Sequence, residues 1–191
     1  MAMRFLASAA AFLALTVAAI AGPPVPRKSP EFIVNDPSGK QIPISSFKGK
    51  VLVMPFMFTT CPHCQREAQM LTKLQREFGS RGVVMLGTVF NDASGPLATQ
   101  FVKEFNIGFP VGYATRDAVT GYLGLSVMDR WVVPQVAILD KKGNIVAQSL
   151  AAGSPELQDE TYLRNFLEKL LKEGAAPAKT GQRGSGSEDH R

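Results

Sequence analysis

The tetrapeptide Cys61-Pro62-His63-Cys64 places two thiols one helical turn apart, directly after the apolar segment 51–58. An apolar segment of this length, bounded by turn residues, is typical of a buried strand. Pro62 falls where a first helical turn would begin, and its missing N–H costs nothing there. Beyond the second cysteine, apolar side chains recur at helical spacing: Ala68, Leu71, Leu74 and Phe78. The pattern predicts a strand, a short turn and a helix beginning at Cys61, whose free N–H groups and dipole would stabilise a thiolate.

The number of ligating residues separates three interpretations of this cysteine pair. The chain has two cysteines and two histidines. A zinc site needs two further ligands at a regular spacing, but one histidine is His63, inside the motif, and the other is His190, in a polar tail. A purely structural disulfide would close a very small loop and restrict the unfolded chain little. We therefore favour a redox-active dithiol, with no metal and no cofactor beyond the Cys61–Cys64 disulfide.

The first residues have the parts of a secretory signal peptide, expected over residues 1–21. Arg4 supplies a charged start, residues 5–20 are apolar, and Ala19-Ile20-Ala21 offers a cleavage site. The apolar run is long for a signal peptide, so residues 5–20 could instead remain as a membrane anchor. In both cases the expected location is periplasmic or secreted, where disulfides persist, and an anchored form would sit on the outer face of the inner membrane.

Composition divides the remaining chain into three parts. Residues 22–30 are rich in proline and are expected to form an extended linker. Residues 31–173 have the length of one domain that can bury a full core. Residues 174–191 lack apolar periodicity and are expected to be a disordered tail. The net charge of +5 is scattered, without a basic block, so nucleic-acid binding is not expected.

Apolar periodicity and turn residues predict the other elements of the domain. A hairpin is expected before the cysteine strand, and a further strand after the cysteine helix completes a βαβ unit with a right-handed crossover. The last helix is expected to be capped by Ser154, with Pro155 at its first position. In chain order, the other expected segments are a hairpin over 31–44, a strand over 82–90, a helix over 97–105, an extended piece over 109–113, a short helix over 117–123 and a hairpin over 132–149.

This element order, with C-P-H-C at the first helix start, resembles the thioredoxin fold. The resemblance covers about residues 31–173 and is closest to the TlpA/ResA-like branch of extracytoplasmic thiol–disulfide oxidoreductases. Residues 133–146 are similar to that branch's "P-T-x-F-L-I-D-x-x-G-x-I" stretch. The resemblance implies an α/β fold: a central mixed sheet flanked by helices, with an N-terminal β-hairpin and an α-rich insertion before the last hairpin.

Position and resemblance together assign roles around the motif. Cys61, exposed at the helix start, is expected to attack a substrate disulfide, and Cys64, one turn further in, to resolve the mixed disulfide. Pro134 matches the family's cis-proline, which would turn the Val133 backbone toward the substrate; a proline at a sheet edge is the alternative. Trp131 could flank the substrate groove or could serve as a packing residue.

Two ionisable residues of the helix have two interpretations each. Glu67 matches an acidic residue that is suggested to handle protons in ResA-like proteins, but an acidic residue near a helix start is also favoured by the dipole. His63 completes the dipeptide of DsbA-type oxidases, where it stabilises the thiolate and makes the disulfide more oxidising. The alternative is an exposed histidine with little effect, because the dipole and N–H groups dominate.

The chain also departs from the family pattern, and two other functions share parts of it. Thr60 stands where these families place tryptophan, and Pro55 stands where thioredoxin has a buried acid. A peroxiredoxin needs its proline and threonine at fixed positions before the cysteine, and here both are displaced by one residue. A Sco-like copper-binding assembly protein has a similar Phe58-to-Pro62 segment, but it spaces its cysteines further apart and adds a histidine.

The expected function is therefore that of an extracytoplasmic thiol–disulfide oxidoreductase that reduces or exchanges disulfides in protein partners. The resemblance implies partners such as cysteine-containing proteins in cytochrome maturation or oxidase assembly, together with a membrane or periplasmic redox partner. The length of the insertion favours a reductase, whereas the C-P-H-C dipeptide favours an oxidase. The direction of electron flow stays open at this point.

Overall fold

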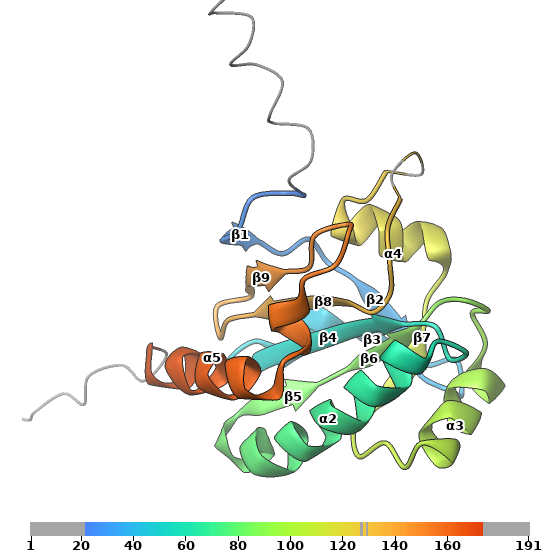
Figure 1. Ribbon diagram of the computed structural model, residues 1–191, viewed down its shortest axis with the longest axis horizontal. Coiled ribbons are helices and arrows are strands. Elements are labelled where there is room, and N and C mark those ends of the chain that lie inside the picture. Colours follow the sequence, from blue (N-terminus) through green and yellow to red (C-terminus); the bar gives the residue numbers. More distant parts are fainter. Residues whose placement is uncertain (1–21, 127, 129, 174–191) are drawn as a thin grey trace, which may run out of the picture.

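The computed structural model describes residues 22–126, 128 and 130–173. The expected signal peptide or anchor and the expected C-terminal tail lie outside the described residues. The described strands form one mixed sheet in the order β1-β9-β8-β4-β6-β7-β2-β3, with β5 also paired to β4 (Figure 1). Their bounds are β1 Arg27–Lys28, β2 Ile33–Asn35, β3 Gln41–Pro43, β4 Val51–Met57, β5 Val83–Met85, β6 Gly87–Val89, β7 Val111–Tyr113, β8 Gln135–Leu139 and β9 Asn144–Gln148.

Strand β4 lies at the centre of the sheet and carries the chain directly into the cysteine motif. All seven of its residues are buried, as the apolar run predicts. It pairs in parallel with β5 and β6 on one side and antiparallel with β8 on the other. The expected βαβ unit and the two expected hairpins, β2–β3 and β8–β9, are therefore confirmed.

The expected strand over 82–90 is divided into β5 and β6 at Leu86, and Pro55 explains the break. The register on β4 is continuous, since Val53 pairs with Met85 and Phe56 with Thr88. Pro55 therefore lies opposite the junction, and it has no backbone N–H to donate across the ladder. One hydrogen bond is lost in the middle of the sheet, although proline in strands is usually confined to edges or bulges.

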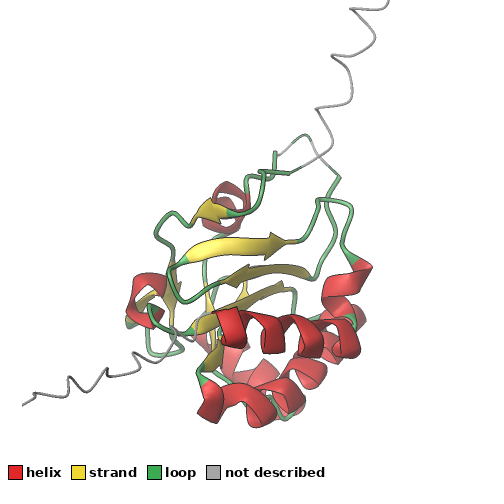
Figure 2. Ribbon diagram, turned by 90° about the vertical axis from the view of Figure 1, so that its left-hand side faces the viewer, coloured by secondary structure: helices red, strands yellow, loops and turns green. Residues whose placement is uncertain are grey.

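Helices cover both faces of the sheet, so two apolar cores form (Figure 2). On one face, α2 (Pro62–Phe78), α3 (Gly95–Glu104) and α5 (Glu160–Glu173) enclose the larger core. On the other face, α4 (Arg116–Leu123) packs with the β2–β3 hairpin over a second core that includes Phe32, Phe56 and Tyr122. Three short 3₁₀ segments complete the described elements: η1 Ile44–Phe47, η2 Gly79–Arg81 and η3 Pro155–Gln158. This architecture confirms the predicted fold class.

The insertion between the βαβ unit and the last hairpin contributes a strand as well as helices. It contains α3, β7 and α4. Strand β7 pairs in parallel with β6, and its Tyr113 lies opposite Asn35 of β2. Gly112 allows this close approach, because a Cβ at that position would lie 2.3 Å from the Asn35 carbonyl oxygen. The N-terminal hairpin is thereby joined to the main sheet through the insertion.

The last residues of the expected linker 22–30 are part of the sheet. Strand β1 pairs antiparallel with β9, with Arg27 opposite Ile145 and Lys28 opposite Asn144. The Arg27 guanidinium also donates to the Gln148 side chain, and the Ser29 backbone N–H donates to Gly143. This segment covers the outer edge of β9 rather than holding the domain at a distance.

The start of the last helix differs from the sequence prediction. Ser154 and Pro155 lead only into the short segment η3, and α5 begins later, at Glu160. The cap is Asp159, whose Oδ1 accepts a hydrogen bond of 2.7 Å from the Tyr162 N–H. The Ser154 hydroxyl instead accepts from the Leu150 N–H in the preceding loop. The prediction of a Ser154 cap was wrong because that loop competes for its side chain.

Candidate functional site

Cys61 is the N-cap of α2, at the carboxyl end of the central strand. Its backbone is extended, and its side chain does not cap the helix. The thiol is half-buried and free, and its Sγ lies 3.8 Å from the carbonyl oxygen of Val133. The first N–H groups of the helix therefore point toward the region where a Cys61 thiolate would carry its charge, which favours that charge.

Cys64 lies one turn further along α2 and is fully buried. Burial raises the pKa of its thiol far above the usual range, and a hydrogen bond from the Phe58 backbone offsets this only in part. The two thiols are thus chemically unequal, as the sequence predicted from their positions. Cys61 is reachable by a second protein, whereas Cys64 is reachable chiefly by Cys61.

Glu67 is buried in the second turn of α2, with 4% of its surface exposed. Among the described residues, neither carboxyl oxygen has a hydrogen-bond partner. Burial raises the pKa of Glu67 well above its usual value, and the nearby charge of Cys61 adds to this effect. The alternative of a first-turn residue held by the helix dipole does not describe it, because the first turn of α2 contains no acidic residue.

Val133 lies opposite Cys61, and Pro134 follows it in the chain. The Val133–Pro134 peptide bond is cis, and Pro134 is buried directly before β8. Strand β8 is an inner strand between β9 and β4, so the alternative of a proline at a sheet edge does not apply. The Val133 carbonyl faces the sulfur of Cys61 at 3.8 Å.

His63 is exposed at the start of α2, beside Pro62, and its ring is turned toward Arg66. Its Nδ1 lies 3.1 Å from the Arg66 guanidinium. Because arginine can only donate, Nδ1 is the acceptor, and a neutral ring carries its proton on Nε2. Within the described part of the chain His63 makes no hydrogen bond to Cys61, so its influence on the thiolate would act through space.

Polar contacts that the sequence analysis missed hold the turn before Cys61. The Thr59 N–H donates to Asn91 Oδ1 at 3.1 Å, and the Asn91 amide lies 3.3 Å from the Thr59 hydroxyl. Gln65 reaches back from α2 and donates to the Thr59 carbonyl at 2.8 Å. The Thr59 hydroxyl therefore accepts from Asn91, and the two residues together hold the turn before Cys61. Asn91 follows β6, so only the parallel pairing of β6 with β4 brings it here.

Gln135 is a second missed residue, and it joins the two loops that flank the site. It is fully buried at the start of β8. Its Nε2 donates to the carbonyls of Val132 at 2.8 Å and Leu150 at 3.1 Å, and the Ala151 carbonyl lies 3.4 Å away. The Val132 N–H completes the connection by donating to Ala151. The backbone that faces Cys61 is therefore anchored from beneath.

Aromatic rings form a cluster in the core that Val133 also packs against. Trp131 is half-buried and stacks on Phe90 with ring centroids 5.8 Å apart, and Phe58 meets both rings edge-on. The Arg116 guanidinium lies 5.3 Å from the Phe58 ring centroid and 5.5 Å from that of Trp131. Trp131 is thus a packing residue of this aromatic cluster, and its expected place beside a substrate groove stays a prediction.

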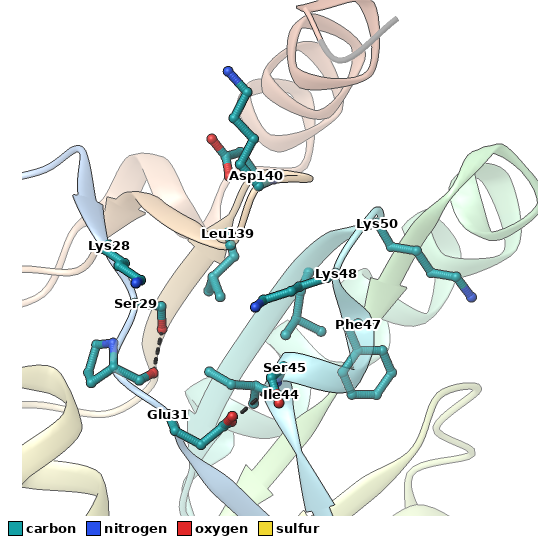
Figure 3. A pocket seen from close by; sticks show the side chains of 14 residues that line it. Lys28, Ser29, Glu31, Ile44, Ser45, Phe47, Lys48, Lys50, Leu139 and Asp140 are labelled. Carbon is teal, nitrogen blue, oxygen red and sulfur yellow. Dashed lines mark hydrogen bonds between the residues drawn. The ribbon is translucent and has the colours of Figure 1, made fainter.

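A pocket of about 260 Å³ lies away from the cysteine motif, at the opposite end of β4 (Figure 3). Leu52 and Leu139 are among its apolar lining residues, and Lys28 and Lys48 extend toward it from opposite sides. Its lining includes neither cysteine. The pocket is therefore separate from the cysteine motif.

No group of three or more His, Cys, Asp and Glu side chains in residues 22–126, 128 and 130–173 is arranged to hold a metal ion. No helix in the same part of the chain is both long and apolar enough to cross a membrane.

Comparisons of sequence agree with this site. The family described as Redoxin matches residues 24–167. The thiol-disulfide oxidoreductase ResA of Bacillus anthracis is 26% identical over 140 residues, which is 73% of this chain and 77% of ResA. The ResA of Bacillus subtilis (strain 168) is 28% identical over 119 residues, covering 62% of this chain and 63% of that protein.

Solved structures share the fold. A thiol:disulfide interchange protein of the thioredoxin family from Chlorobium tepidum TLS is 23% identical and superposes with a TM-score of 0.63, covering 78% of this chain and 99% of that one. The thioredoxin domain of a thiol-disulfide oxidoreductase from Bacteroides vulgatus is 21% identical, also with a TM-score of 0.63 and coverage of 78% and 99%. The comparisons do not favour the peroxidase or the copper-binding alternative.

Proposed function

The chain belongs to the Redoxin family and is a thiol–disulfide oxidoreductase, and from this premise we propose that it reduces disulfides in extracytoplasmic protein partners. The observation that carries the proposal is the inequality of the two thiols: Cys61 is accessible at the N-cap of α2, and Cys64 is buried one turn later. An accessible thiolate beside a buried resolving thiol suits attack on a disulfide held at the surface.

In the proposed first step, the Cys61 thiolate attacks one sulfur of the partner's disulfide. The partner's S–S bond breaks, a Cys61–partner disulfide forms, and the released partner thiolate takes up a proton. The Val133 carbonyl, 3.8 Å from Cys61 Sγ, and the adjacent backbone form one wall for an extended partner segment. Gln135 keeps that wall in place from below.

In the proposed second step, Cys64 attacks Cys61 Sγ. The Cys61–Cys64 disulfide forms, the second partner thiolate leaves, and two electrons have passed to the partner. Cys64 must first lose its proton, and its raised pKa makes this difficult without a base nearby. We assign this role to Glu67. Once Cys61 is bonded to the partner it carries no charge, so one of the two causes that raise the Glu67 pKa disappears, and the carboxyl group can release its proton and then accept the one from Cys64.

The proposed location and direction rest on the sequence and on the relatives. Residues 1–21 have the parts of a secretory signal or anchor, and an external compartment suits a redox disulfide. A partner reductase in or near the membrane would return two electrons to the Cys61–Cys64 disulfide after each cycle. An equilibrium titration against glutathione tests the direction: we expect a potential nearer the reducing end of the range of about −270 to −120 mV known for such dithiols.

Trapping of the mixed disulfide tests the roles of the two thiols. A Cys64→Ser variant should accumulate covalent complexes with partner proteins, because the second step is blocked. A Cys61→Ser variant should accumulate none, because its remaining thiol is buried. Alkylation of the reduced wild-type protein under native conditions, mapped by mass spectrometry, should label Cys61 first. Preferential labelling of Cys64, or equal trapping by both variants, would contradict the assignment.

A further inference from the structure

The guanidinium of Arg116 lies over the two segments that meet at Cys61. Phe58 precedes Cys61 in the turn, and the Cys61 N–H donates to the Phe58 carbonyl at 3.2 Å. Trp131 precedes Val133, whose carbonyl faces Cys61 Sγ. The guanidinium lies 5.3 Å and 5.5 Å from the two ring centroids. Two residues of extended chain span at most about 7 Å, so this cation is within reach of a partner residue close to the attacked disulfide.

Contact with the two rings leaves N–H groups of Arg116 available for hydrogen bonds. A guanidinium that stacks on aromatic faces keeps its N–H groups in its own plane, directed outward. Arg116 is exposed, and within the described residues it forms no ion pair with a carboxylate. The rings also restrict its side chain, so less conformational entropy is lost when a ligand binds. The geometry therefore presents a planar fork of donors, which matches the two oxygens of a carboxylate.

The surface next to this fork is apolar, and it is continuous with the Val133 wall. Val132 and Leu150 are 47% and 49% exposed, so both offer apolar surface to a partner. Their backbones are tied together by Gln135. Gly153, with φ of +96°, allows the second loop to approach Val132, because a Cβ there would lie 3.1 Å from a Val132 methyl carbon. Val132 of the apolar patch and Trp131, which carries the cation, thus directly precede Val133, whose carbonyl faces Cys61.

We propose that Arg116, oriented by Phe58 and Trp131, recognises an acidic side chain within about three residues of the disulfide cysteine that Cys61 attacks. The occupant is an extended segment of a protein partner with a carboxylate for Arg116 and an apolar side chain for Val132 and Leu150. This inference rests on the proposed function, since it specifies which disulfide substrates react fastest. Arg116 is a specificity-determining residue and takes no part in electron transfer.

Peptide disulfides that differ in a single charge test the proposal. In each peptide, one position within three residues of the cysteine carries Glu, Gln or Lys, and the rate constant for reduction by the dithiol form is measured by stopped flow. Trp131, the one tryptophan of the chain, provides the fluorescence signal. We expect the best Glu peptide to react about fivefold faster than its Lys counterpart, as for one exposed ion pair, and the ratio to fall at high salt.

Three variants test whether the preference for Glu needs the planar guanidinium of Arg116 or only a positive charge. Arg116→Gln should abolish the preference, so that the Glu, Gln and Lys peptides react at similar rates. Arg116→Lys, which keeps the charge but not the planar fork, should retain less than half of the preference. Arg76→Gln removes the same charge from an exposed position near the far end of α2 and should keep the full preference.

The outcomes distinguish this inference from the proposed function. Normal reduction of all peptides at equal rates, or a preference that survives Arg116→Gln, would overturn recognition by Arg116 and leave the oxidoreductase assignment intact. If Arg116→Lys kept the full preference, the claim that the planar guanidinium recognises the carboxylate would be overturned. If the wild-type dithiol reduced none of the peptides, both the reductase function and the inference would be overturned.

Discussion

At the scale of single residues, Glu67 is an ionisable group in the protein interior, with 4% of its surface exposed. It is a carboxyl group without a hydrogen-bond partner among the described residues, buried beneath a pair of redox-active thiols. An orphan carboxyl in a packed interior lowers stability when it is charged, so its presence calls for a functional reason. Proton transfer during closure of the Cys61–Cys64 disulfide would supply that reason.

The Glu67→Gln variant should slow the second chemical step while leaving the first nearly unchanged. Gln has similar size but cannot accept the Cys64 proton. We expect closure of the disulfide to slow by about 10²-fold, the lower end for loss of a general base, and the mixed disulfide with a model peptide to accumulate transiently. Rapid quenching with acid followed by mass spectrometry measures this. Unchanged closure would remove Glu67 from the mechanism.

Glu67 also predicts how stability depends on pH. Its native pKa lies above the ordinary value of 4.5, so between these values the unfolded chain has released a proton that the native protein retains. The native state then binds more protons, and its stability falls as pH rises through that window. Relative to the wild type, Glu67→Gln should therefore become more stable as pH rises above about 4.5, by at most about 1.4 kcal/mol per pH unit.

Urea unfolding of the wild type and of Glu67→Gln, both in the dithiol form and from about pH 4 to pH 8, measures the difference between their free energies of unfolding. The difference should be flat below the ordinary pKa of a glutamate side chain and should rise above it. A difference that stayed constant across the whole range would show that Glu67 titrates at the same pH in the native and unfolded chains.

At the scale of elements, the cysteine strand and helix were predictable from the sequence, whereas their supports were not. The run 51–57 is apolar on both faces, and α2 has a continuous apolar stripe, so local pattern alone defines both. Asn91, Gln135 and Arg116 reach the site from β6, β8 and α4. Their roles depend on the order of the strands in the sheet. Single polar residues give no periodic pattern in the sequence, so these roles could not be predicted.

The start of α5 shows the same limitation. Ser154-Pro155 and Asp159-Glu160 both resemble helix starts, and local preference alone could not choose between them. The choice was made by the loop before the helix, because the Ser154 hydroxyl accepts the Leu150 N–H. A tertiary hydrogen bond to the Ser154 side chain therefore explains why α5 begins at Glu160 and not at Pro155.

Replacing the cap that the structure identifies should destabilise α5. Asp159→Ala removes the acceptor for the Tyr162 N–H and should lower the free energy of unfolding by about 1 kcal/mol. Asp159→Asn keeps a capping oxygen at the same position and serves as the matched control, with a loss of only a few tenths of a kcal/mol. Chemical denaturation gives both values. Equal losses for the two variants would mean that Asp159 does not act as the cap.

At the scale of the whole molecule, the sheet reaches further toward the N-terminus than composition suggested. The proline-rich segment had the composition of a free spacer, yet β1 lies along β9 as the outermost strand. Two residues of strand give no periodic signal, and their partner lies more than a hundred positions away in the sequence, so no local pattern could have revealed the pairing.

Removal of β1 should weaken the edge of the sheet that it covers. A protein beginning at Ser29 lacks the β1–β9 pairs and the Arg27–Gln148 contact. Compared with a protein beginning at Gly22, we expect it to lose about 1–2 kcal/mol of stability and to associate at high concentration through the uncovered strand. Thermal unfolding and light scattering test this. Identical behaviour of the two proteins would mean that β1 adds no stability.

The docking of β1 also fixes the direction from which the polypeptide enters the domain. Arg27 and Lys28 are paired with the sheet, and Pro23 contacts the glycine that ends α4. Any protein joined ahead of residue 22 would therefore be attached to a rigid edge and would have a restricted set of orientations relative to Cys61. A protein fused at this end would hold the Cys61 sulfur in a restricted orientation toward a chosen target. The distance between the two would depend only on the length of the added linker.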